Sequence, residues 1–331
     1  MSYRLKAKES IAEGIRRVVL EEIDSAEKEL SGQGSKRETA IHEARKSVKK
    51  VRGVLRLMRP ELGNTYCNEN ARFRDIGRRL SEVRDTVATI EVFDCVLDKF
   101  KDGIQRNGFD SIRRALQKNK LETEERVNLE KLMQSSVSAL RAAKRRLKTW
   151  PLKADGFSAV APGLELTYRA GRKALAQVKK DPTPENYHYF RRRVKDHWYH
   201  VRLLESVWTE VMQAHEASLK KLETWLGDDH NLVVLCEQLH TEPEKFGDGN
   251  TAQLFTSLAQ QYQKELRDNA VSFGERAYEQ KPRQFVNNMA KLWQDWQNQP
   301  DSAKKVEQEQ RQAAKKQPGH QASKASNTAV A

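Results

Sequence analysis

A chain of 331 residues is long enough for two domains of ordinary size. With only 9 Pro and 16 Gly it holds too few turn residues for a β-sandwich or barrel, and it contains no apolar run of about 18 residues that would span a membrane. The net charge of +14 favours a polyanionic partner such as nucleic acid, an anionic membrane surface or a phosphate polymer.

The three cysteines, Cys67, Cys95 and Cys236, are far apart and form no CxxC pair. A disulfide framework or a zinc knuckle is therefore not expected. Residues 1–9 are not followed by the apolar segment of a secretory signal. We expect reduced thiols in a cytoplasmic protein.

In the first half of the chain, apolar residues recur at helical spacing in six segments. Ser35 and Glu38 form an S-x-x-E capping box that opens the second of them, and Pro60 closes it. The predicted helices are 9–30, 35–59, 66–85, 87–103, 109–119 and 122–149.

The helical pattern stops between Trp150 and Gly163, which predicts a domain boundary. Thr183 is expected to cap a helix whose first turn holds Pro184. The second-half helices are predicted over 164–180, 184–207, 209–226, 230–241, 250–278 and 282–298. The predicted organisation is a first helical bundle in 1–155, a second in 156–299 and a disordered tail in 300–331, which lacks large apolar residues.

An internal repeat relates the two halves. The segment that begins at His42 recurs 146 residues later at His188, and the register continues without a gap through the rest of both helices. Further along, Arg84-Asp85 overlies His230-Asn231. The simplest interpretation is two halves of similar design.

Each copy carries a helix with one packing face and one cationic face. The cationic face of the first helix holds His42, Arg45, Lys46, Lys49, Arg52 and Arg56, and that of the second holds His188, Arg191, Arg192, Lys195, Tyr199 and Arg202. The helix before each of them is expected to add further cations, namely Arg16, Arg17, Arg169, Arg172 and Lys173.

Such faces are unusual, because like charges one helical turn apart repel. Arginine forks and lysine ammonium groups suit phosphate oxygens, and their regular spacing along a helix suits a linear polyanion better than one small anion. The first basic helix lacks the exposed aromatic residues that stack nucleic-acid bases, whereas the second has Trp198 and Tyr199. Nucleic acid therefore stays an alternative partner.

Two histidines, His42 and His188, begin the basic helices, where neighbouring cations should lower their pKa. A neutral imidazole can still donate one N–H to a phosphate, and we expect ligand contact rather than a metal site. His197 and His200 have the spacing of a metal pair but no accompanying carboxylate or cysteine, so no metal or other cofactor is expected.

Gly227 is expected to end a helix, and Asp228-Asp229 to cap the next one rather than bind Mg²⁺. No phosphate loop, nucleophile elbow or HExxH motif is present. We therefore expect no catalysis, with a metal-dependent polyphosphate-processing enzyme as the less favoured alternative.

The repeated pattern H-x-x-R-[KR]-x-x-[KR], carried by the two segments from His42 and His188, resembles the CHAD family, the conserved histidine α-helical domain. The similarity extends over about residues 9–298. Trp198 departs from it, because Arg52 stands at that position in the first copy.

The resemblance implies an all-α fold of two antiparallel four-helix bundles, related by a pseudo-twofold, whose basic helices face a central channel. It implies binding of inorganic polyphosphate without catalysis. A cytoplasmic protein, associated with polyphosphate granules and without a membrane partner, is the matching expectation.

Overall fold

The computed structural model describes residues 3–32, 37–247 and 249–298. This part of the chain forms twelve α-helices and three short 3₁₀ helices, with no strand. The helices of the first half are α1 (Ile11–Ser31), α2 (Arg37–Leu57), α3 (Arg59–Leu62), α4 (Asn64–Arg79), α5 (Ser81–Lys99), η1 (Arg106–Phe109), α6 (Asp110–Arg126) and α7 (Leu129–Leu147). Those of the second half are α8 (Phe157–Lys180), α9 (Pro184–Leu203), η2 (Glu205–Val207), α10 (Thr209–Thr241), η3 (Pro243–Lys245), α11 (Gly249–Ala277) and α12 (Pro282–Asn298).

The starts of α1 and α9 are set by their capping residues. Ser10 and Glu13 form a reciprocal capping box at α1. Thr183 accepts a hydrogen bond from the backbone of Asn186, and Pro184 is the first residue of α9, as predicted. The capping box predicted at Ser35 lies outside the described residues.

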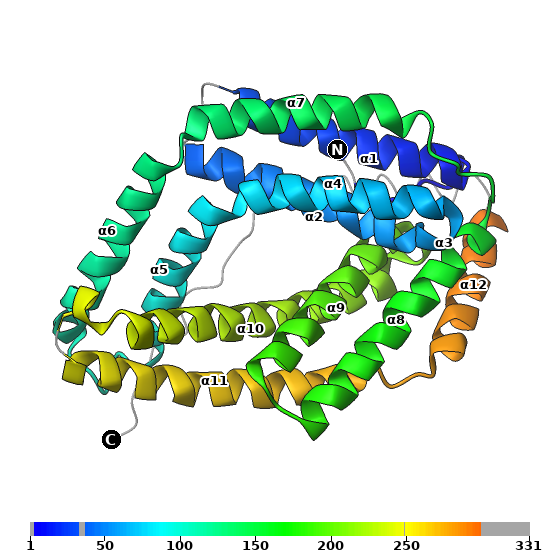
Figure 1. The fold of residues 1–331 in the computed structure, drawn as a ribbon. Helices are drawn as coiled ribbons and strands as arrows, with labels where there is room; N and C mark the ends of the chain where they lie inside the picture. The colour runs from blue at the N-terminus through cyan, green and yellow to red at the C-terminus, as the bar shows by residue number, and fades with distance from the viewer. Residues whose placement is uncertain (1–2, 33–36, 248, 299–331) are drawn as a thin grey trace, which may run out of the picture.

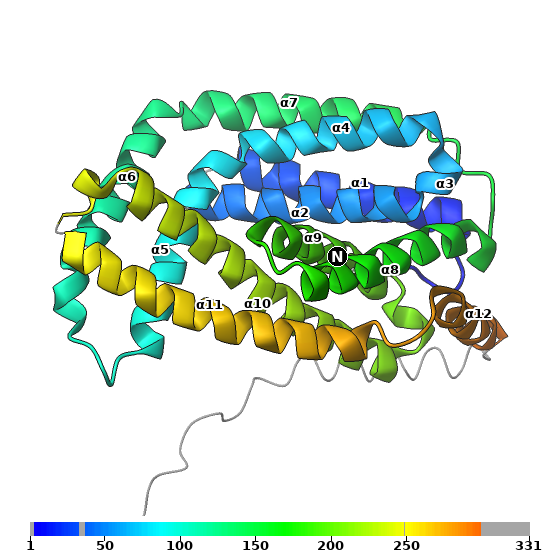
Figure 2. The same ribbon diagram turned by 60° about the horizontal axis from the view of Figure 1, so that its bottom comes forward.

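The helices of each half pack mainly with one another. Helix α1 lies against α2 and α7, and α4 lies between α2 and α7 (Figure 1). In the second half α9 lies between α8 and α10, and α11 lies along α10 (Figure 2). Each half therefore places four long helices side by side.

Two hydrophobic cores hold the molecule together. The larger core takes side chains from α1, α2, α4 and α7 and equally from α8, α9 and α12, so it continues across residues 150–163. Gly163 of α8 shows how close the halves come, because a Cβ there would lie 1.7 Å from the carbonyl oxygen of Leu57 in α2. The division of the chain at residue 155 stays a prediction, but the cores do not divide there.

The smaller core joins the hairpin of α5 and α6 to α10 and α11. Phe93 of α5 stacks on Phe255 of α11, with ring centroids 5.1 Å apart. A first-half hairpin thus buries its apolar face on the second half. This packing extends the fold at the end remote from α12 (Figure 1).

Several helix boundaries differ from the predictions. Helices 66–85 and 87–103 are α4 and α5, which break at Leu80. The boundary expected near residue 120 falls at Val127 and Asn128, where Asn128 caps α7. Helix α8 begins at Phe157 rather than Leu164, because Pro162 is accommodated inside it and Gly163 packs on α2.

The prediction that Gly227 ends a helix is wrong, because α10 runs unbroken from Thr209 to Thr241. A glycine costs a helix about 1 kcal/mol, which tertiary packing readily offsets. Asp228 and Asp229 are therefore mid-helix residues and not caps. Asp229 is buried and accepts a hydrogen bond from Arg267 of α11 at 2.6 Å.

None of the described helices is long and apolar enough to cross a membrane. The three cysteines are free.

Candidate functional site: two cavities between the basic helices

The two predicted basic helices, α2 and α9, meet toward their C-terminal ends. A Cβ on Gly53 of α2 would lie 2.8 Å from the Cβ of Tyr199, so only glycine permits this approach. Nε2 of the fully buried His200 lies 3.0 Å from the carbonyl oxygen of Gly53. The contact fixes how the cationic faces of the two helices oppose each other.

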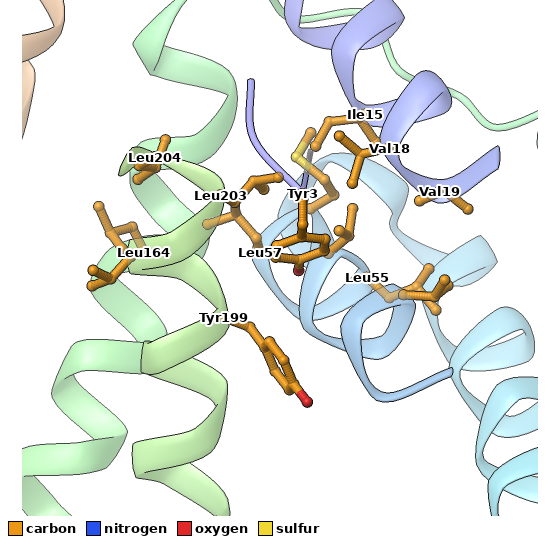
Figure 3. Close-up of a cluster of buried hydrophobic side chains, with 14 of the residues drawn as sticks. Tyr3, Ile15, Val18, Val19, Leu55, Leu57, Leu164, Tyr199, Leu203 and Leu204 are labelled. Carbon is orange, nitrogen blue, oxygen red and sulfur yellow. The ribbon is translucent and has the colours of Figure 1, made fainter. Parts of the chain in front are cut away.

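Tyr199 links the hydrophobic core to these cationic faces. Its ring packs edge-on against Tyr3, at a centroid distance of 6.0 Å, and is 4% exposed. In Figure 3 its hydroxyl points away from the cluster of buried side chains that includes Leu203. Tyr199 lines both cavities described next.

The first cavity, here called the arginine cavity, has a volume of about 340 Å³. Among the described residues that line it, the only carboxylate is Asp196, which pairs with Arg56 at 2.8 Å and with Arg193 at 3.1 Å. The lining is Arg45, Val48, Lys49, Arg52, Arg56, Arg74, Gly77, Arg78, Ser81, His188, Arg191, Arg192, Lys195, Asp196 and Tyr199.

The second cavity, here called the mixed cavity, has a volume of about 920 Å³ and contains residues of both signs. Its cationic and histidine residues are His42, Arg45, Lys46, Lys49, Lys50, Arg84, His188, Arg191, Lys195, Arg202, Lys220 and His230. Its acids are Asp85, Glu91, Glu216, Glu223 and Asp228.

Six residues line both cavities and are called the shared wall. They are Arg45, Lys49, His188, Arg191, Lys195 and Tyr199. The four cations come in equal number from α2 and α9, so cationic side chains from the two halves of the chain lie together. These are the residues that the repeat pairs with one another.

The charges of the shared wall are crowded and poorly solvated. Burial lowers the pKa of Lys49 well below its ordinary value, and the charges of Lys195, Arg45 and Arg191 lower it further. No ion pair joins Lys49 to a carboxylate within the described part of the chain. An anion placed here would relieve a repulsion that the free protein sustains.

Burial and neighbouring cations also lower the pKa values of residues that line the arginine cavity. The pKa of Arg52 is lowered to about 10, chiefly by burial and then by the charge of Arg56. Burial also lowers the pKa of Arg45, which donates to the carbonyl of Leu80 at 3.2 Å. These guanidinium groups are held within the protein rather than spread into water.

The predicted histidines lie in the mixed cavity. Burial lowers the pKa of His42, with a further effect of Arg84, and lowers that of His188, with further effects of Arg191 and Arg192. The ring of His188 lies 4.2 Å from that of His230, centroid to centroid. The lowered pKa values of His42 and His188 favour their neutral imidazoles, and a bound anion would shift both back towards the protonated form.

The remaining predicted site residues lie in neither cavity. Arg16 donates to the carbonyl of Trp150, Arg17 pairs with Glu9, and Arg169 is engaged by Glu165 within its own helix. Arg172 donates to the carbonyl of Tyr278, and Lys173 is exposed elsewhere on α8. Arg16, Arg17 and Arg172 thus join α1 and α8 to neighbouring segments.

Sequence reasoning missed the contribution of α4 and α10. Arg74 and Arg78 of α4 are one helical turn apart and line the arginine cavity, and Lys220 of α10 lines the mixed cavity. The 146-residue register pairs Arg74 with Lys220, a signal that was present in the sequence. The predicted site cations lie only on the two basic helices and the helices before them.

The same register relates most of the remaining lining of the two cavities. Apart from the shared wall and Val48, every residue of the arginine cavity has its repeat partner in the mixed cavity. The pairs are Arg52 with Trp198, Arg56 with Arg202, Arg74 with Lys220, Gly77 with Glu223, Arg78 with Thr224, Ser81 with Gly227, Arg192 with Lys46, and Asp196 with Lys50.

His197 and His200, considered as a metal pair, are completely buried core residues. His197 is surrounded by the rings of Tyr168, Tyr278 and Phe285. Among the described residues there is no group of three or more His, Cys, Asp or Glu side chains arranged to hold a metal ion.

Comparison with known proteins agrees with this architecture. The family profile of the CHAD domain matches residues 17–240. The crystal structure of the CHAD domain from the plant Ricinus communis superposes with a TM-score of 0.60 at 16% identity, over 84% of this chain and 95% of that one. No curated protein matches the sequence.

Proposed function

Since this chain belongs to the CHAD domain family, we propose that it binds inorganic polyphosphate, or a similar linear phosphate polyanion, without transforming it. The observation that carries the proposal is the shared wall, where Arg45 and Lys49 of α2 lie with Arg191 and Lys195 of α9. A chain of closely spaced phosphates would neutralise these crowded cations one after another.

We further propose that the arginine and mixed cavities are the two ends of one channel through a pair of pseudo-twofold-related bundles. The repeat pairs support this, because a twofold that exchanges α2 and α9 would also exchange the two cavities. A linear polymer can occupy both ends at once, whereas a single small anion cannot. Bound in this way the protein would gather with polyphosphate granules in the cytoplasm.

The arrangement of carboxylates supports binding rather than catalysis. Phosphoryl transfer needs carboxylates free to hold metal ions beside the phosphates. Glu223, the most buried acid of the mixed cavity, is engaged by Lys195 and Lys220, and Asp196 is engaged by Arg56. These acids act as partners for protein cations.

A filter-binding competition tests the proposal. Labelled polyphosphate should be retained by the protein, and unlabelled polyphosphate should displace it at a far lower phosphate concentration than single-stranded or duplex DNA. Mg²⁺ should not shorten the polymer recovered after binding. Displacement by DNA at equal phosphate concentration would favour a nucleic-acid-binding module, and Mg²⁺-dependent shortening would favour a processing enzyme.

A further inference from the structure

The mixed cavity holds a buried carboxylate, Glu223, at the position where the repeat places the smallest residue of the arginine cavity. The repeat partner of Glu223 is Gly77, which adds no side chain to the arginine cavity. Glu223 is 4% exposed, although it lines the mixed cavity. A buried carboxylate therefore lies beside the cations of the mixed cavity.

The carboxylate of Glu223 occupies the centre of a cation cluster. Lys195 Nζ lies 2.6 Å from Oε1, Lys220 Nζ lies 3.0 Å from Oε2, and Arg191 Nη2 lies 3.6 Å from Oε1. Burial alone would raise the pKa of Glu223, but these three charges outweigh it and lower the pKa below its ordinary value. Its two oxygens thus hold the cations as phosphate oxygens would.

The arginine cavity offers its cations with less competition. Asp196 engages Arg56 and, outside the lining, Arg193. No buried carboxylate pairs with Arg78 or Arg192 in the described part of the chain. An oligophosphate can therefore reach Arg78 and Arg192 without displacing a buried carboxylate of the protein.

We propose that Glu223 is a built-in competitor for phosphate, which makes the two ends of the channel unequal: short oligophosphates take the arginine cavity, and only longer chains displace the Glu223 carboxylate from Lys195 and Lys220. This inference rests on the proposed function. It assigns Glu223 as the residue that determines chain-length preference.

The test is titration calorimetry with tripolyphosphate and with a long-chain polyphosphate, at one fixed salt concentration. Glu223→Gln keeps the size of the side chain and removes its charge, and it should bind the long chain about tenfold more tightly than wild type, since a charge-assisted competitor is gone. Glu275 is an exposed residue of α11 that lines neither cavity. Glu275→Gln makes the same change in net charge and should shift affinity by less than about twofold.

The reciprocal variant is Gly77→Glu, which introduces a competitor into the arginine cavity. A Cβ at Gly77 meets only Val48, at an ordinary distance of 3.5 Å, so this variant should fold. It should bind tripolyphosphate at least about tenfold more weakly than wild type.

If the Glu223→Gln variant binds long-chain polyphosphate no more tightly than the Glu275→Gln variant does, the inference is overturned. If removing the partner of the buried Lys195 prevents folding, the Gly77→Glu result decides, and unchanged tripolyphosphate affinity overturns the inference. A wild-type chain that binds neither polymer overturns the proposed function itself, which is a different result.

Discussion

At the scale of single residues, this protein keeps ionisable groups in buried places where their charged forms are disfavoured. Lys49 lies among cations in the shared wall, whereas His197 and His200 lie in the hydrophobic core. Burial lowers the pKa of both kinds of group, but the consequences differ. An anion from outside can restore the charge of Lys49, whereas protonation of the core histidines opposes folding.

The first prediction concerns Lys49 and the pH dependence of polyphosphate affinity. Because its pKa in the free protein is lowered well below the ordinary lysine value, Lys49 should take up a proton when the polyanion binds, and affinity should fall as pH rises through the range between the lowered pKa and the ordinary value. Calorimetry in two buffers of different ionisation enthalpy measures this proton uptake. Lys49→Arg, which stays protonated, should bind with a smaller pH dependence, and an identical dependence would contradict the assignment.

The second prediction concerns acid stability. Burial lowers the pKa of His200 to about 3 and that of His215 to about 4, both below the ordinary value of the unfolded chain. Stability is therefore complete above about pH 6.5 and is lost progressively as pH falls towards these values, by several kcal/mol in total.

Urea unfolding at a series of pH values measures this loss. His200→Gln can still donate a hydrogen bond to the Gly53 carbonyl, and it should lose part of the pH dependence while folding at neutral pH. A variant with the full wild-type dependence would show that His200 is not one of the responsible groups.

At the scale of helices, close approach at glycine positions decides how the cationic faces oppose each other. Gly53 allows α2 to touch Tyr199 of α9, and Gly163 allows α8 to touch α2. Both contacts lie beside the C-terminal end of α2, away from the start of the cationic face. Gly53 therefore sets the spacing of the two basic helices, and Gly163 sets that of α8 and α2.

The third prediction tests this role of Gly53. Gly53→Ala should destabilise the protein by about 1–3 kcal/mol, because the added methyl group would overlap the Tyr199 side chain unless α9 shifts. It should also weaken polyphosphate binding, although no charge is altered. Thermal unfolding and the binding titration measure the two effects, and Gly249→Ala, where nothing lies within 4 Å, is the matched control. Equal behaviour of the two variants would exclude Gly53 as the spacer.

The helices that sequence predicted well are those whose signals are local. Apolar periodicity placed α1 correctly, and the cap at Thr183 placed the start of α9. Two helix breaks that the sequence predicted are absent because of tertiary packing. Gly163 stays helical because it packs on Leu57, and Gly227 stays helical within the packed α10. Local propensity is a weak guide where tertiary packing offsets it.

At the scale of the whole molecule, the repeat in the sequence brings cations from distant segments into one site. The shared wall was predictable because its residues recur in register on α2 and α9. The sequence could not predict that Arg17 and Arg172 lie outside the cavities. Their orientation depends on tertiary contacts, namely the ion pair of Arg17 with Glu9 and the hydrogen bond of Arg172 to the carbonyl of Tyr278. Likewise, no local pattern predicts that the α5–α6 hairpin packs on the second half.

The fourth prediction concerns salt. A chain that contacts cations of both cavities should bind with a steep salt dependence, because each neutralised phosphate releases counterions. About eight contacts would give a slope near −6 in a plot of log K against log salt, using a single-strand value of about −0.7 per contact. Titrations at several salt concentrations measure the slope, and a value near −1 would indicate a single contact rather than a channel.

The most direct test of the central claim compares two double charge reversals that alter net charge equally. Arg45→Glu with Lys49→Glu changes the shared wall, whereas Lys144→Glu with Arg145→Glu changes the outer surface of α7. Filter binding should show that the first variant loses far more polyphosphate affinity than the second, because it adds repulsion inside the site and uncouples the two halves. Equal losses in the two variants would contradict the account, since they would mean that the protein attracts the polymer by its overall charge alone.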